Sequence, residues 1–230
     1  MVRVAATLAV GLLALCCAAC SGGGEDEPAV ATLEPLSALG PLEPAPSPGK
    51  LGGELVPIPD APPLAPAASQ VSPDEDVDGI KCERNAKLVF HEHVHLTVFV
   101  GGEQRAVPAG IGIWPKIGPE NYRPSPIGPQ FGETPANCIT WLSTRYADGL
   151  IHVESSEERS FVLGDFFTVW GQPLGRDRVG PAEGDVTAVV NRKVWNGDPA
   201  DIPLNGHDQI QLQVGAPLVT PPSVAFPGAF

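Results

Sequence analysis

Histidines recur on alternate residues in the stretch "VFHEHVHLTVFV", which begins at Val89 and holds three of the chain's five histidines. Successive side chains on a β-strand point to opposite faces, so His91, His93 and His95 would share one face. Neutral imidazole is the commonest metal ligand in proteins. Side chains at i and i+2 lie about 6.6 Å apart along a strand, which lets two adjacent rings converge on one ion. The pattern therefore predicts one arm of a metal or polar-ligand site.

A third ligand must come from another strand. His91 and His95 would be about 13 Å apart on a straight strand, too far to share an ion. The segment "LIHVES" places His152 and Glu154 opposite its apolar residues, so it offers a matching polar face. The predicted ligands are His93, His95 and His152. The predicted flanking or second-shell groups are His91, His207 and Glu154. Zinc is the first candidate for such imidazole ligands and copper(II) the second.

An alternative explanation is a wet polar face. All five histidines fall on the polar side of a predicted strand, where imidazoles can simply be solvated. Three classes of function stay open: a binding module, a metal-dependent hydrolase or lyase with a general base such as Glu154, and an interaction domain with incidental histidines. The sequence has no G-x-S-x-G, H-E-x-x-H, P-loop or dinucleotide motif. A binding module is therefore favoured over an enzyme.

The elements that would position these residues belong to an α+β domain at 80–217. Alternating runs predict strands around 89–100, 138–155, 185–195 and 208–214, with Gly101-Gly102 as a hairpin turn. Leu163, Phe166, Phe167 and Trp170 recur at helical spacing before Gly171, and this predicts one principal short helix. Two similar hairpins flanking a helix favour a mainly antiparallel sheet of β-grasp type.

The N-terminus has the pattern of a lipoprotein signal peptide over residues 1–19. Arg3 precedes an apolar run that is too short to span a bilayer, and small residues follow it. Cys20 is the predicted lipidation site, with an ordinary secretory signal as the alternative. We expect the protein in the bacterial cell envelope, anchored to the outer face of the plasma membrane or to the outer membrane.

Cys82 and Cys138 are the remaining cysteines of an exported chain. Two such thiols are predicted to form a disulfide, with metal binding as the alternative. A disulfide between them would close the loop of the chain from Cys82 to Cys138, which would stabilise the fold by roughly 4 kcal/mol on the chain-entropy model.

Residues 20–79 are rich in proline, alanine and glutamate and show no sustained apolar period. They are predicted to be a disordered tether with a relaxed span on the order of 40 Å. The net charge of −13 is concentrated there: ten acidic residues and one basic residue lie between Ser21 and Val77. No basic stripe exists, so nucleic acid is not an expected partner. Residues 218–230 are predicted to form a flexible tail.

The segments "HVHL…VPAGIGI", "WL…DGLIHVES", "FFTVWGQPL" and "IPLNGHDQIQLQVG" resemble an uncharacterised family of bacterial exported and lipoprotein domains. The resemblance covers roughly Cys82 to Pro217 and implies no particular activity. It implies that relatives often carry histidine in the segment matching "LSTR", where Ser143 and Arg145 stand here. The histidines that still match are His93, His95, His152 and His207.

Overall fold

The computed structural model describes residues 31–67, 71, 75–84, 87–114 and 138–226. The expected signal peptide and Cys20 lie outside the described residues, as does most of the Pro/Gly-rich sequence from Ile113 to Pro135. Within the described ranges, no helix has the length and apolarity needed to cross a membrane.

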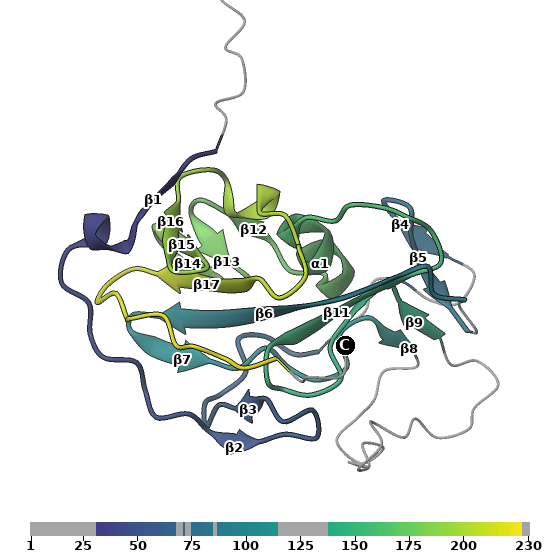
Figure 1. The fold of residues 1–230 in the computed structure, drawn as a ribbon, viewed down its shortest axis with the longest axis horizontal. Coiled ribbons are helices and arrows are strands. Elements are labelled where there is room, and N and C mark those ends of the chain that lie inside the picture. Colours follow the sequence, from purple (N-terminus) through teal and green to yellow (C-terminus); the bar gives the residue numbers. More distant parts are fainter. Residues whose placement is uncertain (1–30, 68–70, 72–74, 85–86, 115–137, 227–230) are drawn as a thin grey trace, which may run out of the picture.

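An eight-stranded sheet forms the centre of the molecule (Figure 1). Its strands lie in the order β1, β16, β15, β17, β6, β11 and β10, and β7 pairs with the end of β6. Their bounds are β1 Leu33–Pro35, β6 Phe90–Val100, β7 Glu103–Arg105, β10 Leu142–Ser143, β11 Leu150–Ser155, β15 Val186–Val190, β16 Lys193–Trp195 and β17 Gln209–Val214. Pairing is antiparallel except between β17 and β6. The expected α+β fold with a mainly antiparallel sheet is confirmed.

The order of the elements fits the expected β-grasp type. β6 and β7 form a hairpin through Gly101 and Gly102, which both have positive φ angles of 59° and 79°. The helix and the β15–β16 hairpin follow, and β17 then inserts beside β6 in parallel. β10 and β11 extend the sheet beyond β6, and β11 brings His152 alongside the histidine strand.

The principal helix, α1 (Leu163–Trp170), covers one face of this sheet and has the predicted bounds. The Asp165 side chain accepts a hydrogen bond from Val162 N at 3.0 Å, and Gly171 ends the helix with φ +70°. Its buried side chains are Leu163, Phe166, Phe167, Val169 and Trp170. They pack in one core with the apolar side chains of β6, namely Val94, Leu96 and Val98. The alternate residues of β6, including the histidines, therefore face away from α1.

Three smaller sheets and two 3₁₀ helices surround the main sheet. The strands are β2 Lys50–Leu51 with β3 Pro57–Ile58; β4 Asp76–Val77, β5 Ile80–Glu83, β9 Cys138–Thr140 and β8 Ile113–Trp114; and β12 Leu174–Gly175, β13 Arg178–Val179 and β14 Ala182–Glu183. The 3₁₀ helices are η1 Leu36–Leu39 and η2 Pro199–Asp201.

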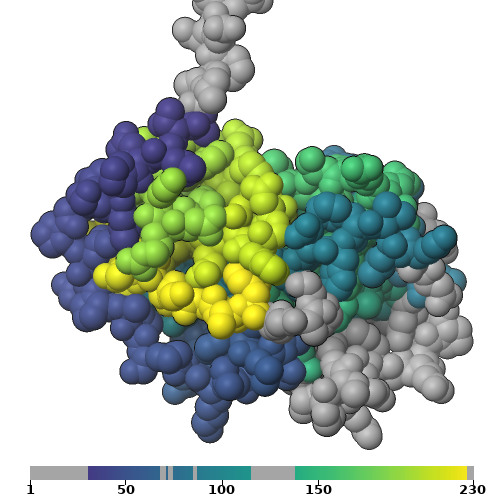
Figure 2. All heavy atoms as spheres, viewed as in Figure 1, coloured from purple at the N-terminus to yellow at the C-terminus, as the bar shows by residue number. Residues whose placement is uncertain are grey.

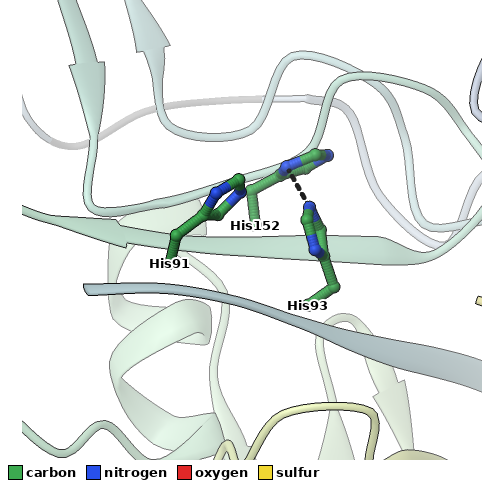
Figure 3. Close-up of side chains that lie close together, drawn as sticks. All are labelled: His91, His93 and His152. Atoms are coloured by element: carbon green, nitrogen blue, oxygen red, sulfur yellow. Dashed lines mark hydrogen bonds between the residues drawn. The ribbon is translucent and has the colours of Figure 1, made fainter. Parts of the chain in front are cut away.

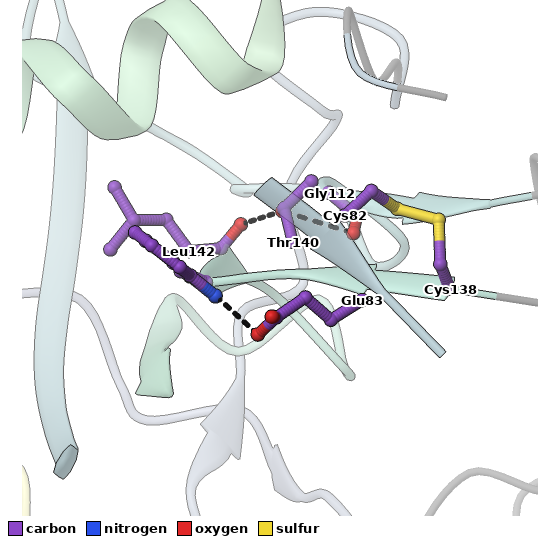
Figure 4. Close-up of a disulfide and its surroundings, with 7 residues drawn as sticks. Cys82, Glu83, Gly112, Cys138, Thr140 and Leu142 are labelled. Carbon is purple, nitrogen blue, oxygen red and sulfur yellow. Dashed lines mark hydrogen bonds between the residues drawn. A yellow bond between two sulfur atoms is a disulfide. The ribbon is translucent and has the colours of Figure 1, made fainter. Parts of the chain in front are cut away.

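The disulfide predicted between Cys82 and Cys138 is confirmed (Figure 4). Their Cα atoms are 5.3 Å apart, which is ordinary for such a bond. The bond ties β5 to β9, and Trp141 Nε1 next to it donates to the Glu83 carboxylate at 2.6 Å. The disulfide therefore anchors β9, which directly precedes β10 of the main sheet in the chain.

The N-terminal segment corrects one prediction. Residues 31–67, here called the N-terminal strap, are not a disordered tether but lie against the domain. β1 pairs with β16, Val56 is fully buried, and Leu64 joins the main core. The prolines do not prevent this, because an extended chain at a sheet edge needs few backbone donors. The strap's order comes from contacts distant in sequence, which local periodicity does not report.

The C-terminal segment corrects a second prediction. Residues 217–226, here called the C-terminal strap, pack on the sheet instead of forming a flexible tail. Val219 is 2% exposed and bridges to Glu43 of the N-terminal strap. Figure 2 shows this yellow segment lying directly against the blue N-terminal residues. The two straps cover much of the polar face of the sheet: His93, His95 and Gln211 are buried there, whereas His91 stays exposed.

Candidate metal site

Three histidines from two strands meet under the N-terminal strap (Figure 3). His91 and His93 come from β6 and His152 from β11, and one ring nitrogen of each lies within 4.8 Å of the others. His93 Nε2 is 2.9 Å from His152 Nδ1, and the His91 and His93 ring centres are 4.7 Å apart. Three imidazoles arranged in this way could hold a metal ion.

The register between β6 and β11 decides which histidines meet. His152 lies directly opposite His93, and Glu154 lies opposite His91. His95 is opposite Leu150, and its Nε2 donates to the backbone oxygen of Asp148 at 2.8 Å. The expected trio of His93, His95 and His152 is therefore wrong in one member. His91 takes the place of His95, and the reasoning that His91 and His95 cannot share an ion still applies.

Glu54 supplies a carboxylate from the strap that the sequence did not single out. Its Oε2 is 3.1 Å from His152 Nε2. A carboxylate can only accept, so Nε2 of neutral His152 carries the proton and its Nδ1 has the lone pair. That lone pair faces His93. Histidine ligands are typically oriented in this way by a carboxylate behind them.

Local backbone geometry places Glu54 in this position. Gly53 approaches Tyr146 so closely that a Cβ atom at Gly53 would lie 2.2 Å from the Tyr146 hydroxyl. Leu55 has a φ of +63°, which is rare for leucine, and its side chain is exposed. The β2–β3 hairpin thus adopts a strained turn beside a buried carboxylate. In the sequence, the Gly52-Gly53 pair is a turn signal that could have indicated this hairpin.

Arg145 joins two carboxylates at the edge of the cluster. Its guanidinium lies 2.6 Å from Glu154 Oε1 and 3.6 Å from Glu54 Oε1. Glu154 Oε1 is also 3.2 Å from His91 Nε2 and 3.9 Å from His152 Nδ1. Glu154, expected as a flanking group, therefore lies within reach of the same central point as the histidines.

Burial keeps the central histidines neutral. Desolvation, together with the neighbouring His152 and His91 rings, lowers the pKa of His93 to about 3. Burial also lowers the pKa of His152, although the hydrogen bond to Glu54 partly opposes this. Imidazoles that are already neutral have no proton to release before binding a cation.

The other expected residues lie around the cluster. The backbone N–H of His207 donates to the His93 oxygen at 2.7 Å, and the His207 ring stacks on Phe226. Ser143 lies opposite His152 in β10, and its buried hydroxyl has no hydrogen-bond partner among the described residues.

Asp148 is a second buried acidic group that sequence reasoning did not identify as unusual. Its side chain accepts from Leu150 N at 3.0 Å, while Oδ2 has no partner among the described residues. Burial raises the pKa of Asp148 to about 7, a net value in which the hydrogen bond from Leu150 N opposes the shift and the negative charge of Glu54 supports it. Burial likewise lowers the pKa of His95 to about 4.

Comparisons with known proteins returned nothing: no family model, no curated protein and no solved structure matches this chain.

Proposed function

We propose that this protein is a lipid-anchored domain of the bacterial cell envelope that binds one divalent metal ion, zinc in the first instance. The observation that carries the proposal is the convergence of His91, His93 and His152 within 4.8 Å. Ligand atoms bound at about 2.0–2.1 Å in a tetrahedron are about 3.3 Å from one another. Three of the six distances among the ring nitrogens and Glu154 Oε1, at 2.9, 3.2 and 3.9 Å, lie around that value, and the three histidine nitrogens all lie within 4.8 Å of one another.

Glu154 is the proposed fourth ligand. Its Oε1 faces His91 and His152 and is also the atom that lies 2.6 Å from the Arg145 guanidinium. Coordination through Oε1 would therefore move the Arg145 contact to Oε2. His93 would carry its proton on Nδ1 in the metal-bound state, because its Nε2 now faces His152 Nδ1. That exchange between neutral tautomers needs no net loss of a proton.

Binding is favoured over hydrolysis by the same geometry. A catalytic zinc site keeps one position open for water. Here the Glu154 carboxylate is proposed for the fourth position, and His93 and His152 are 2% and 0% exposed, while the His91 side chain is 31% exposed at the edge of the cluster. The arrangement suits an ion that is held or sensed and gives a substrate little access.

The test uses protein purified without a histidine tag. We expect one zinc ion per chain by elemental analysis and a saturable calorimetric titration. His93→Ala and His152→Ala should each lower the affinity by at least a hundredfold. His207→Ala is the matched control, because it removes a histidine outside the cluster, and it should bind as the unmodified protein does. Unchanged zinc binding in His152→Ala would refute the site.

The anchor is tested separately. Cys20→Ala should move the protein from the membrane fraction to the soluble fraction after signal cleavage. Ten residues lie between Cys20 and Ala31, where the described residues begin, so eleven Cα-to-Cα steps separate the two. Fully extended they span at most about 40 Å, so the proposed anchor would keep the domain close to the membrane surface. Membrane association that survives Cys20→Ala would contradict the anchor without affecting the metal site.

A further inference from the structure

Glutamines recur on alternate residues of β17 and form a ladder on the face opposite the core. Gln209, Gln211 and Gln213 share this face, while Ile210 and Leu212 pack in the core. Gln211 and Gln213 are 3% and 1% exposed, so neither amide is solvated. Their partner is the backbone of the C-terminal strap.

Two of the three amides each hold one residue of the strap at both of its backbone groups. Gln213 accepts from Val219 N at 2.6 Å and donates to Val219 O at 3.1 Å. Gln209 accepts from Val224 N at 3.0 Å and donates to Val224 O at 3.1 Å. A primary amide that pairs with both the N–H and the C=O of one residue recognises the main chain and tolerates many side chains.

The middle amide, that of Gln211, makes a hydrogen bond through its nitrogen but, within the described part of the chain, not through its oxygen. Gln211 donates to Val219 O at 2.9 Å, but its buried Oε1 has no partner among the described residues. Val219 and Val224, which bind Gln213 and Gln209, are five positions apart in the strap, whereas the two glutamines are only four positions apart in β17. The strap therefore arches away from the sheet through Pro221 and Pro222, above a cavity of about 200 Å³ that Gln211 lines. A flat extended peptide would pass all three amides at the strand spacing of about 6.6 Å between alternate residues.

We infer that this ladder is a docking groove for an extended, uncharged, proline-containing peptide of another protein, with the C-terminal strap as its occupant in the isolated chain. The contacts of the glutamines are neutral amide pairs, and Arg192 Nη1 adds a donor to the backbone oxygen of Pro221 at 3.0 Å. Such a set of donors and acceptors favours an uncharged backbone ligand. Prolines fit such a ligand because they bring no unsatisfied N–H groups and favour the extended form. The inference is independent of the proposed metal site.

The probe is a fluorescent peptide with the sequence of residues 217–226, and binding is measured by anisotropy. The receptor is the full chain with residues 218–226 replaced by a glycine/serine sequence of equal length. We expect this receptor to bind the peptide at least tenfold more tightly than the unmodified chain, where the tethered strap competes at a high effective concentration. A peptide N-methylated at the positions of Val219 and Val224 should bind at least tenfold more weakly, because it lacks both donors.

Receptor variants identify the groove. In the replaced-strap protein, Gln209→Leu and Gln213→Leu should each weaken the peptide about tenfold, whereas Gln172→Leu, outside the groove, should not. A folded receptor that binds no peptide, or binds it regardless of these glutamines, would overturn the inference. If the replaced-strap protein does not fold, millimolar peptide is added to the unmodified chain and amide exchange is followed at Val219 and Val224. Faster exchange supports displacement of the strap, and unchanged exchange overturns it.

Discussion

Asp148 should make the stability of this domain depend on pH in a way that one substitution removes. Its side chain is 2% exposed, and its pKa rises from an ordinary 3.8 to about 7 in the folded protein. A group whose pKa is raised on folding binds more protons when folded, so its contribution to stability is lost as pH rises. The loss begins above the unfolded pKa and is complete once the pH has passed the folded pKa of about 7.

The magnitude follows from the two pKa values. Between pH 5 and pH 8.5, ionisation of Asp148 should cost about 3 kcal/mol of unfolding free energy, at 1.36 kcal/mol for each pKa unit. Asp148→Asn keeps an oxygen that can accept from Leu150 N but cannot ionise. The variant should therefore gain about 3 kcal/mol relative to the unmodified protein over this range. A constant cost of about 1–3 kcal/mol for an unpaired amide group would shift the whole curve without changing its slope.

The measurement is urea unfolding with the disulfide intact and a chelator present, at half-unit steps from pH 5 to 8.5. The buried histidines titrate in both proteins, so their contribution cancels in the difference. Asp201→Asn is the control, because Asp201 is exposed, and its difference from the unmodified protein should be flat. A flat difference for Asp148→Asn as well would refute the assignment of a raised pKa to this carboxyl group.

Three further predictions follow from the core and the site. Phe166→Ala should lower the unfolding free energy by about 3–5 kcal/mol in urea denaturation, because a fully buried ring is removed from under the sheet. Replacing Cys82 and Cys138 together by serine should cost about 4 kcal/mol in the same assay, since the disulfide closes a sequence separation of 56 residues. Glu54→Gln should weaken zinc binding by about 10–100-fold in calorimetry without changing its stoichiometry, because the amide orients His152 less well.

Local patterns were enough to predict the elements of the fold. The alternation in 89–100 and the helical spacing in 163–170 directly report which side chains a core can bury, and both elements form. The straps are different. Their order rests on pairings such as Leu33 with Trp195 and Glu43 with Val219, which are too distant in sequence for any local period to reveal.

The sequence predicts a histidine cluster shared by two strands, but it does not predict which residues make up the cluster. The sequence indicates an H-x-H arm with a partner from the "LIHVES" segment, and β6 and β11 do pair. Whether His91 or His95 completes the cluster depends on the register between two strands about fifty residues apart. No hairpin turn connects these strands to fix that register. Glu54 was hidden for a related reason, since a carboxylate in a proline-rich segment has no local signal of burial.

Glu54 also makes the N-terminal strap and the proposed ion dependent on one another. Suppose that its contact with His152 Nε2 raises the zinc affinity by a factor of 10–100. Thermodynamic linkage then requires bound zinc to raise the equilibrium constant for docking of the N-terminal strap by the same factor. The docked strap buries Val56 completely, so the amide exchange of Val56 reports on docking. Saturating zinc should then slow that exchange by about 10–100-fold in the unmodified protein and much less in Glu54→Gln. Equal slowing in both would mean that the ion acts on the strap by another route. The N-terminal strap would then cover the site without contributing to it. The contact of Glu54 with His152 predicts instead that the strap takes part in holding the ion.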